Sequence, residues 1–152
     1  VAVVAMPSRR FPSLVESVAQ HIATVGRLPL VDALAVSGPP PSADSSSAVR
    51  AKDLLYRTTL RDGVAFDGPV LLVDDILESG LTLSFAKKLL LERGAKHVSI
   101  CTLLDKPGKR LTQLEADFVG FQCGDEFLVG YGLDWAHRFR GLPYIGVVEK
   151  TT

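Results

Sequence analysis

The segment Val70–Leu83 (VLLVDDILESGLTL) constrains the fold of this chain more than any other part of it. Its first four residues are apolar and are typical of a strand buried on both faces of a parallel sheet. Asp74 and Asp75 follow at the end of that strand. After a turn at Glu78–Gly80, apolar side chains recur at helical spacing over Leu81–Arg93. The segment therefore predicts a strand–turn–helix unit of an α/β fold.

The rest of the chain alternates apolar runs with one further helical segment. A helix is predicted from Ser13 to Gly26, with Ser13 as its N-cap and Glu16 completing a capping box. Strands are predicted at Val1–Met6, Leu28–Val36, Val98–Leu104, Phe118–Phe121, Phe127–Val129 and Tyr144–Val148. This order predicts a mostly parallel twisted sheet with helices on both faces. The short late strands predict a small C-terminal antiparallel hood.

The length of 152 residues predicts one domain spanning residues 1–152. Within it, Ser37–Ser47 (SGPPPSADSSS) combines three prolines with five serines and has almost no apolar surface to bury. We therefore expect a flexible loop over residues 38–50.

Bulk charge and hydropathy exclude several classes of partner. Seventeen basic side chains balance seventeen acidic ones, so no global field attracts nucleic acid or a membrane surface. No apolar run reaches the roughly 20 residues that span a bilayer, and the start VAVVAM is too short for a signal peptide. Cys101 and Cys123 lie far apart in apolar surroundings, which favours free thiols over a disulfide. We expect a soluble cytoplasmic protein.

The acidic turn after Val73 suits a phosphorylated ligand. In an open parallel sheet, ligands bind at the carboxyl ends of the strands. Gly80 lets the backbone approach a ligand, and the N-terminus of the following helix presents free N–H groups to an anion. Ser79 and Thr82 add hydroxyl donors, while Asp74 and Asp75 suit Mg²⁺. Each of these residues alone also fits a simple helix cap or a solvated acid, but their ordered combination favours a ligand site.

Two resemblances compete for this segment. VLLVDD is similar to the first strand of response-regulator receiver domains, and Lys106-Pro107 to their Lys-Pro pair. Receivers begin with that strand, whereas here it starts only at residue 70, and no strand between Thr82 and Lys106 ends in Asp at the expected distance. Residues 70–83 as a whole instead resemble the phosphoribosyl-diphosphate (PRPP) motif of type I phosphoribosyltransferases.

The resemblance continues towards the C-terminus. Leu103–Lys106 (LLDK), Ala116–Phe121 (ADFVGF) and Phe127–Asp134 (FLVGYGLD), followed by Phe139-Arg140 and Leu142-Pro143, resemble the C-terminal half of hypoxanthine-guanine phosphoribosyltransferases. This similarity covers about half of the chain. It implies the type I phosphoribosyltransferase fold and transfer of a phosphoribosyl group from PRPP to a 6-oxopurine, with release of pyrophosphate.

The same resemblance implies roles for individual residues. Asp74 and Asp75 would hold the ribose hydroxyls and Mg²⁺. The 5′-phosphate would be wrapped by the turn residues Glu78, Ser79, Gly80, Leu81 and Thr82. Glu78 stands where the family usually has Asp, the residue that accepts a proton from purine N7. One extra methylene displaces the carboxylate, and a misplacement of about 1 Å costs around a hundredfold in rate. Binding without catalysis is therefore the alternative.

The remaining implied roles concern the base and the leaving group. Lys106 would donate to the exocyclic oxygen of the purine, Phe127 would stack on its ring, and the Leu128 backbone would read its edge. Asp134 would bind a second Mg²⁺, and Arg140 the pyrophosphate. Without the resemblance, Phe127 is equally compatible with a core position and Lys106 with a solvated turn.

The N-terminal half shows a different similarity. Met6–Pro12 and Val25–Pro29 resemble the phosphoribosyltransferase-like domain of some RecQ-type DNA helicases, and no Gly-Gly or Lys-Gly pyrophosphate loop follows the first strand. We expect a seam around residues 50–70, from an engineered or recombined chimera or a divergent homologue. Arg9 and Arg10 either replace the missing loop or are a solvated pair.

The resemblance also implies how the chain works as a whole. Ser37–Lys52 would close over the site and exclude water. We expect PRPP and a purine base or nucleoside monophosphate as ligands, no role for nucleic acid, and a homodimer or higher homo-oligomer. The alternatives are a non-catalytic PRPP- or nucleotide-binding module and an engineered chimera with little or no activity.

Overall fold

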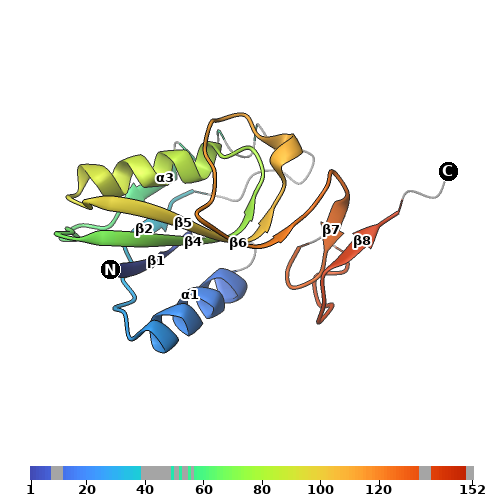
Figure 1. Ribbon diagram of the computed structural model, residues 1–152, viewed down its shortest axis with the longest axis horizontal. Coiled ribbons are helices and arrows are strands. Elements are labelled where there is room, and N and C mark those ends of the chain that lie inside the picture. Colours follow the sequence, from blue (N-terminus) through green and yellow to red (C-terminus); the bar gives the residue numbers. More distant parts are fainter. Residues whose placement is uncertain are drawn as a thin grey trace.

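A four-stranded parallel sheet lies at the centre of the computed structural model (Figure 1), which describes residues 1–7, 12–38, 49, 52, 55, 57–133 and 138–149. The strand order is β1-β4-β5-β6, and every neighbouring pair is parallel. The strands are β1 (Ala2–Ala5), β4 (Pro69–Leu77), β5 (His97–Asp105) and β6 (Phe118–Gln122). The prediction of a mostly parallel sheet is confirmed.

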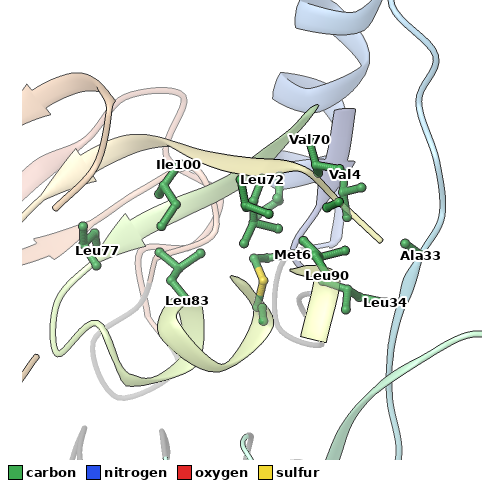
Figure 2. Close-up of a cluster of buried hydrophobic side chains, with 14 residues drawn as sticks. Val4, Met6, Ala33, Leu34, Val70, Leu72, Leu77, Leu83, Leu90 and Ile100 are labelled. Carbon is green, nitrogen blue, oxygen red and sulfur yellow. The ribbon is translucent and has the colours of Figure 1, made fainter. Parts of the chain in front are cut away.

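Among the described residues, helices lie on both faces of the sheet: α1 (Pro12–Gly26) lies below it and α3 (Leu81–Glu92) above it in Figure 1. Successive side chains of a strand point to opposite faces, so β1 contributes to both cores. Val3 packs with Ala19 and Ala23 of α1. Val4 belongs to the larger core on the other face, shown in Figure 2, together with Leu72, Leu83, Leu90 and Ile100. This double cover makes β4 the rigid base of the acidic turn.

Two small antiparallel sheets flank the centre. The first joins β2 (Leu34–Val36) to β3 (Thr58–Leu60). The second joins β7 (Phe127–Val129) to β8 (Gly146–Val148) and lies beyond the carboxyl end of β5, on the right in Figure 1. The 3-10 helix η1 (Pro107–Lys109) follows β5 directly. The predicted C-terminal antiparallel hood is confirmed.

Three predicted boundaries were wrong. Only Leu34–Val36 of the predicted strand Leu28–Val36 is regular, because Pro29 has no N–H and contributes only its carbonyl, to Val3. Helix α1 begins at Pro12, so Ser13 lies inside its first turn and is not the N-cap. Strand β4 continues past Val73 because its pairing with β5 runs on to Leu77 and Asp105. Asp74 and Asp75 therefore lie within the strand.

Three further predictions concern the cysteines, membrane spans and the division of the chain. Cys101 and Cys123 are free thiols of intermediate exposure, as expected. Among the described residues, none of the helices has the length and apolar character that crossing a bilayer requires. Most of the predicted loop over residues 38–50, and several residues of the seam expected around residues 50–70, lie outside the described residues. The single domain over residues 1–152 stays a prediction.

Candidate functional site

The turn between β4 and α3 has the local geometry of an anion site. Gly80 occupies the N-cap position of α3 with φ 77°, and the first turn of the helix contains no acidic side chain. Ser79 Oγ lies 3.4 Å from the Leu81 backbone N–H, which donates to it. The free N–H groups of a helix N-terminus and its positive dipole end favour an anion at this position. Thr82 follows in the first turn, partly exposed.

Gly80 is required here for two reasons that a substitution can separate. Its φ of 77° is strained for other residues, and a Cβ would lie 2.3 Å from Thr112 Oγ1. Gly63 has φ 76° and open space around it, so Gly63→Ala carries the backbone strain alone. We expect Gly63→Ala to cost about 1–2 kcal/mol and Gly80→Ala about 1–3 kcal/mol more, measured by urea unfolding. Equal losses would show that Thr112 yields without cost.

Asp74 and Asp75 form a closely spaced acid pair. The Asp75 N–H donates to Asp74 Oδ1 at 2.9 Å, and the Ile76 N–H donates to Asp75 Oδ1 at 2.8 Å. Burial raises the pKa of Asp74 well above its usual range, and the charge of Asp75 raises it further. Burial also raises the pKa of Asp75. The two neighbouring carboxyl groups therefore resist ionisation, and a cation beside them would favour their ionised form.

The donor set around this acid pair suits Mg²⁺ better than a metal held only by protein. No group of three or more metal-ligating side chains lies together in the part of the chain that the structure describes. Mg²⁺ commonly binds one or two carboxylates and takes its other ligands from water and substrate phosphates. Asp74 and Asp75 fit that pattern.

Lys106 contacts both the turn that follows β4 and the residue that precedes β7. Its side chain is buried, with Nζ 2.6 Å from the Glu126 carbonyl oxygen and 3.4 Å from Glu78 Oε1. Its backbone N–H donates to the Leu77 carbonyl at 2.9 Å. Since only 6% of the side chain is exposed, Lys106 is not a solvated turn residue. The structure thus brings the predicted site residues Glu78 and Lys106 into contact.

Phe127 and Leu128 lie next to this pair on β7. Phe127 directly follows Glu126, whose carbonyl accepts from Lys106, and 48% of Phe127 is exposed. Leu128 is buried. A half-exposed aromatic ring offers a face to a flat ligand, and Phe127 is therefore not a plain core residue.

The remaining predicted residues are Arg140, Asp134, Arg9 and Arg10. Arg140 is half-buried in the segment after β7, where its carbonyl accepts from the Gly132 N–H at 3.0 Å. Asp134, Arg9 and Arg10 lie outside the described residues. A separate pocket of about 290 Å³ is lined by Ala2, Pro29, Phe66 and Pro69. It lies at the amino ends of β1 and β4, whereas the Gly80 turn lies beyond the carboxyl end of β4.

Sequence reasoning missed Asp105 and Arg110. The Arg110 guanidinium donates to the Asp105 carboxylate and, at 2.8 Å, to the Glu78 carbonyl oxygen. The only signal in the sequence is an acid and an arginine five residues apart, on either side of Pro107-Gly108. Their contact with Glu78 depends on how the chain returns after β5.

Comparisons with known proteins identify the family that this chain resembles. Residues 13–135 match the family described as "Phosphoribosyl transferase domain". The chain is 55% identical over 80 residues to the hypoxanthine-guanine phosphoribosyltransferase of Bacillus subtilis (strain 168), covering 53% of this chain and 44% of the relative. It is 53% identical over 79 residues to the hypoxanthine phosphoribosyltransferase of Escherichia coli (strain K12), covering 52% and 44%. The matched half of the chain thus covers less than half the length of these curated relatives.

A solved structure extends the similarity to the whole chain. A hypoxanthine phosphoribosyltransferase from Staphylococcus aureus (orthorhombic crystals) superposes with a TM-score of 0.70 at 32% identity, covering 97% of this chain and 76% of that one. The match therefore includes the N-terminal half, where the sequence showed a different resemblance. Together with the family match over residues 13–135, it shows that this chain belongs to the phosphoribosyl transferase domain family.

Proposed function

We propose that the chain is a purine phosphoribosyltransferase that transfers a phosphoribosyl group from PRPP to hypoxanthine or guanine and releases pyrophosphate. The observation that carries the proposal is the pair of Glu78 and Lys106, whose charged atoms lie 3.4 Å apart beside the Gly80 turn. A 6-oxopurine presents an acceptor oxygen next to its N7, so neighbouring cation and carboxylate complement that edge. The phosphate turn and the base contacts then belong to one site.

The phosphoribosyl side of the proposed site rests on β4 and the turn. The backbone N–H groups of Glu78–Thr82 would bind the 5′-phosphate, and Asp74 and Asp75 would hold the ribose hydroxyls. Bound Mg²⁺ would supply positive charge that neutralises the leaving pyrophosphate. We further assign Asp134 to a second Mg²⁺, and Arg140, with Arg9 and Arg10, to the pyrophosphate.

The base side rests on the residues that surround Lys106. The Lys106 ammonium would donate to the exocyclic oxygen of the purine, and Glu78 would accept the proton of N7. Phe127 would stack on the ring, and the Leu128 backbone would read its edge. Positive charge develops on the ribose as the pyrophosphate leaves. The protein would contribute mainly by holding the purine and PRPP in the geometry for attack on the ribose C1.

The wider organisation is proposed from the family resemblance. We propose that the chain works in the cytoplasm as a homodimer or higher oligomer, and that Ser37–Lys52 closes over the bound ligands. We also propose that its N-terminal half descends from a helicase-linked relative, with the seam around residues 50–70. Light scattering on the purified protein tests the oligomeric state directly.

A non-catalytic PRPP- or nucleotide-binding module is the second candidate, whether natural or an engineered chimera. The observation that favours it is Glu78 itself, which has one methylene more than the usual Asp and already contacts Lys106 at 3.4 Å. Glu78 and Lys106 that contact each other are less available to the purine than separate side chains would be. Phosphoribosyl binding at the turn is independent of this contact.

A pyrophosphate-release assay with Mg²⁺, PRPP and hypoxanthine or guanine tests the proposal. We expect turnover by the wild type, and a loss of about a hundredfold in Lys106→Met, because a buried donor to the purine oxygen is removed. Lys109→Met is the matched control, since Lys109 is exposed on η1. Absence of pyrophosphate release at high enzyme concentration would contradict transfer. Thermal stabilisation by PRPP would then support the binding module.

A further inference from the structure

Between β4 and α3, the consecutive carbonyl oxygens of Leu77, Glu78 and Ser79 accept hydrogen bonds from one short segment, Lys106–Thr112. The Lys106 N–H donates to Leu77 O at 2.9 Å. An Arg110 guanidinium nitrogen donates to Glu78 O at 2.8 Å. The Leu111 N–H donates to Ser79 O at 2.9 Å. The segment after β5 thus braces one side of the turn at every peptide group from Leu77 to Ser79.

This bracing fixes the direction of the N–H groups in the turn. In a planar trans peptide, the carbonyl oxygen and the amide hydrogen point in opposite directions. Holding the carbonyls of Leu77, Glu78 and Ser79 on one side therefore turns the N–H groups of Glu78, Ser79 and Gly80 to the other side. That side faces away from Lys106–Thr112, and there the three N–H groups would donate to a phosphate.

Arg110 supplies the side-chain bond to the middle carbonyl of the three. Its guanidinium also donates to the Asp105 carboxylate, and only 14% of the Arg110 and 10% of the Asp105 side chain is exposed. A planar guanidinium can satisfy both acceptors at fixed angles, which a lysine ammonium does not reproduce. Burying such a pair brings little net stability, so its main consequence is the geometry that it enforces.

We propose that Arg110 is a positioning residue for phosphoribosyl transfer, and that Asp105 orients it. Arg110 fixes the Glu78 peptide, and with it both the phosphate-binding N–H groups and the root of the Glu78 carboxylate. The inference rests on the proposed function because it assigns the turn to a phosphorylated substrate. It adds a residue that touches neither substrate nor metal but sets where both are held.

Arg110→Met tests the role, because it keeps the length of the side chain and removes every donor. We expect the Kd of ribose 5-phosphate to rise about tenfold and kcat/KM for PRPP to fall about 10–100-fold. Arg110→Lys should recover part of both losses, since it restores one donor. Arg61→Met is the matched control: Arg61 pairs with Asp32 at 3.0 Å on the surface, with half of its side chain exposed, and we expect no change.

A second variant covers the case in which Arg110→Met does not fold. Asp105→Asn keeps the acceptor oxygen and removes the charge that orients Arg110, so we expect a smaller loss in the same direction. The double variant should be no worse than Arg110→Met, because both act through one contact. The Ser79 and Gly80 amide resonances, followed during titration with ribose 5-phosphate, report the turn itself.

The outcomes separate this inference from the proposed function. If the wild type binds ribose 5-phosphate and folded Arg110→Met and Asp105→Asn variants bind it equally well, the positioning role is overturned and the proposed function stands. If the variants lose binding while the wild type shows no turnover with any purine, Arg110 still positions the turn for phosphate binding, and transfer is overturned. A wild-type turn that takes up no ribose 5-phosphate overturns both.

Discussion

Replacing Glu78 with Asp is expected to raise kcat for pyrophosphate release by about ten- to a hundredfold, with little change in the affinity for nucleotide. Glu78 Oε1 lies 3.4 Å from Lys106 Nζ, and a side chain shorter by one methylene withdraws the carboxylate from that contact. The Lys106 ammonium still donates to the Glu126 carbonyl, and the hydrogen that faced Glu78 becomes available to the purine oxygen. The carboxylate also moves by about one C–C bond length towards the position that the family's Asp occupies.

The matched controls for Glu78→Asp separate its position from its charge. Glu78→Gln keeps the length and removes the charge, so its rate should fall below that of the wild type. Glu92→Asp shortens an exposed glutamate, paired with Lys88 at 3.8 Å, and should change nothing. Rates with hypoxanthine and guanine at saturating PRPP measure all three variants. If the rate of Glu78→Asp equals that of the wild type, Glu78 does not limit transfer, and the cause of a low rate would lie in the N-terminal half of the chain.

Local patterns predicted the central elements well. The apolar run from Val70 and the helical spacing after Gly80 depend on neighbours in sequence. Helix α3 follows its pattern closely, and β4 contains its apolar run but continues to Leu77. The predicted strand Leu28–Val36 was too long because sheet pairing, not apolar content, decides where a strand is regular. Ser13 fits a capping pattern, yet the helix begins one residue earlier. Boundaries set by tertiary contacts were therefore the weak part of the prediction.

The site was predictable to a different degree on its two sides. The acid pair and the Gly80 turn follow from the chemistry of one continuous segment. Lys106 and Phe127 came from the family resemblance, because no spacing in the sequence brings them to Glu78. The brace from Arg110 to the Glu78 carbonyl spans 32 residues of sequence. Every residue has a backbone carbonyl, so the residue type at position 78 does not indicate that its carbonyl accepts from Arg110. Only the structure reveals that contact.

Asp74→Asn is expected to stabilise the ligand-free protein and to abolish most PRPP binding. Burial, reinforced by Asp75, raises the pKa of Asp74 well above its usual range. As pH rises through that raised pKa, Asp74 ionises in an environment that disfavours its charge, and the wild type loses stability. Asn carries no charge at any pH. At neutral pH we expect a gain of about 1 kcal/mol, or roughly 2–4 °C in Tm.

The dependence on pH and ligand distinguishes this effect from ordinary repacking. Well below pH 4, Asp74 is protonated in both the folded and the unfolded chain, so wild type and Asp74→Asn should differ little. Their Tm values should separate as pH rises towards neutrality, whereas Asp62→Asn, on the exposed turn before Gly63, should follow the wild type throughout. Mg²⁺ with PRPP should reverse the order at neutral pH, because the cation favours the ionised pair and binds only the native state. If Asp74→Asn is less stable than the wild type at pH 7 without ligand, the acid pair is held by contacts that compensate its charge, and its raised pKa does not reflect a cost to the fold.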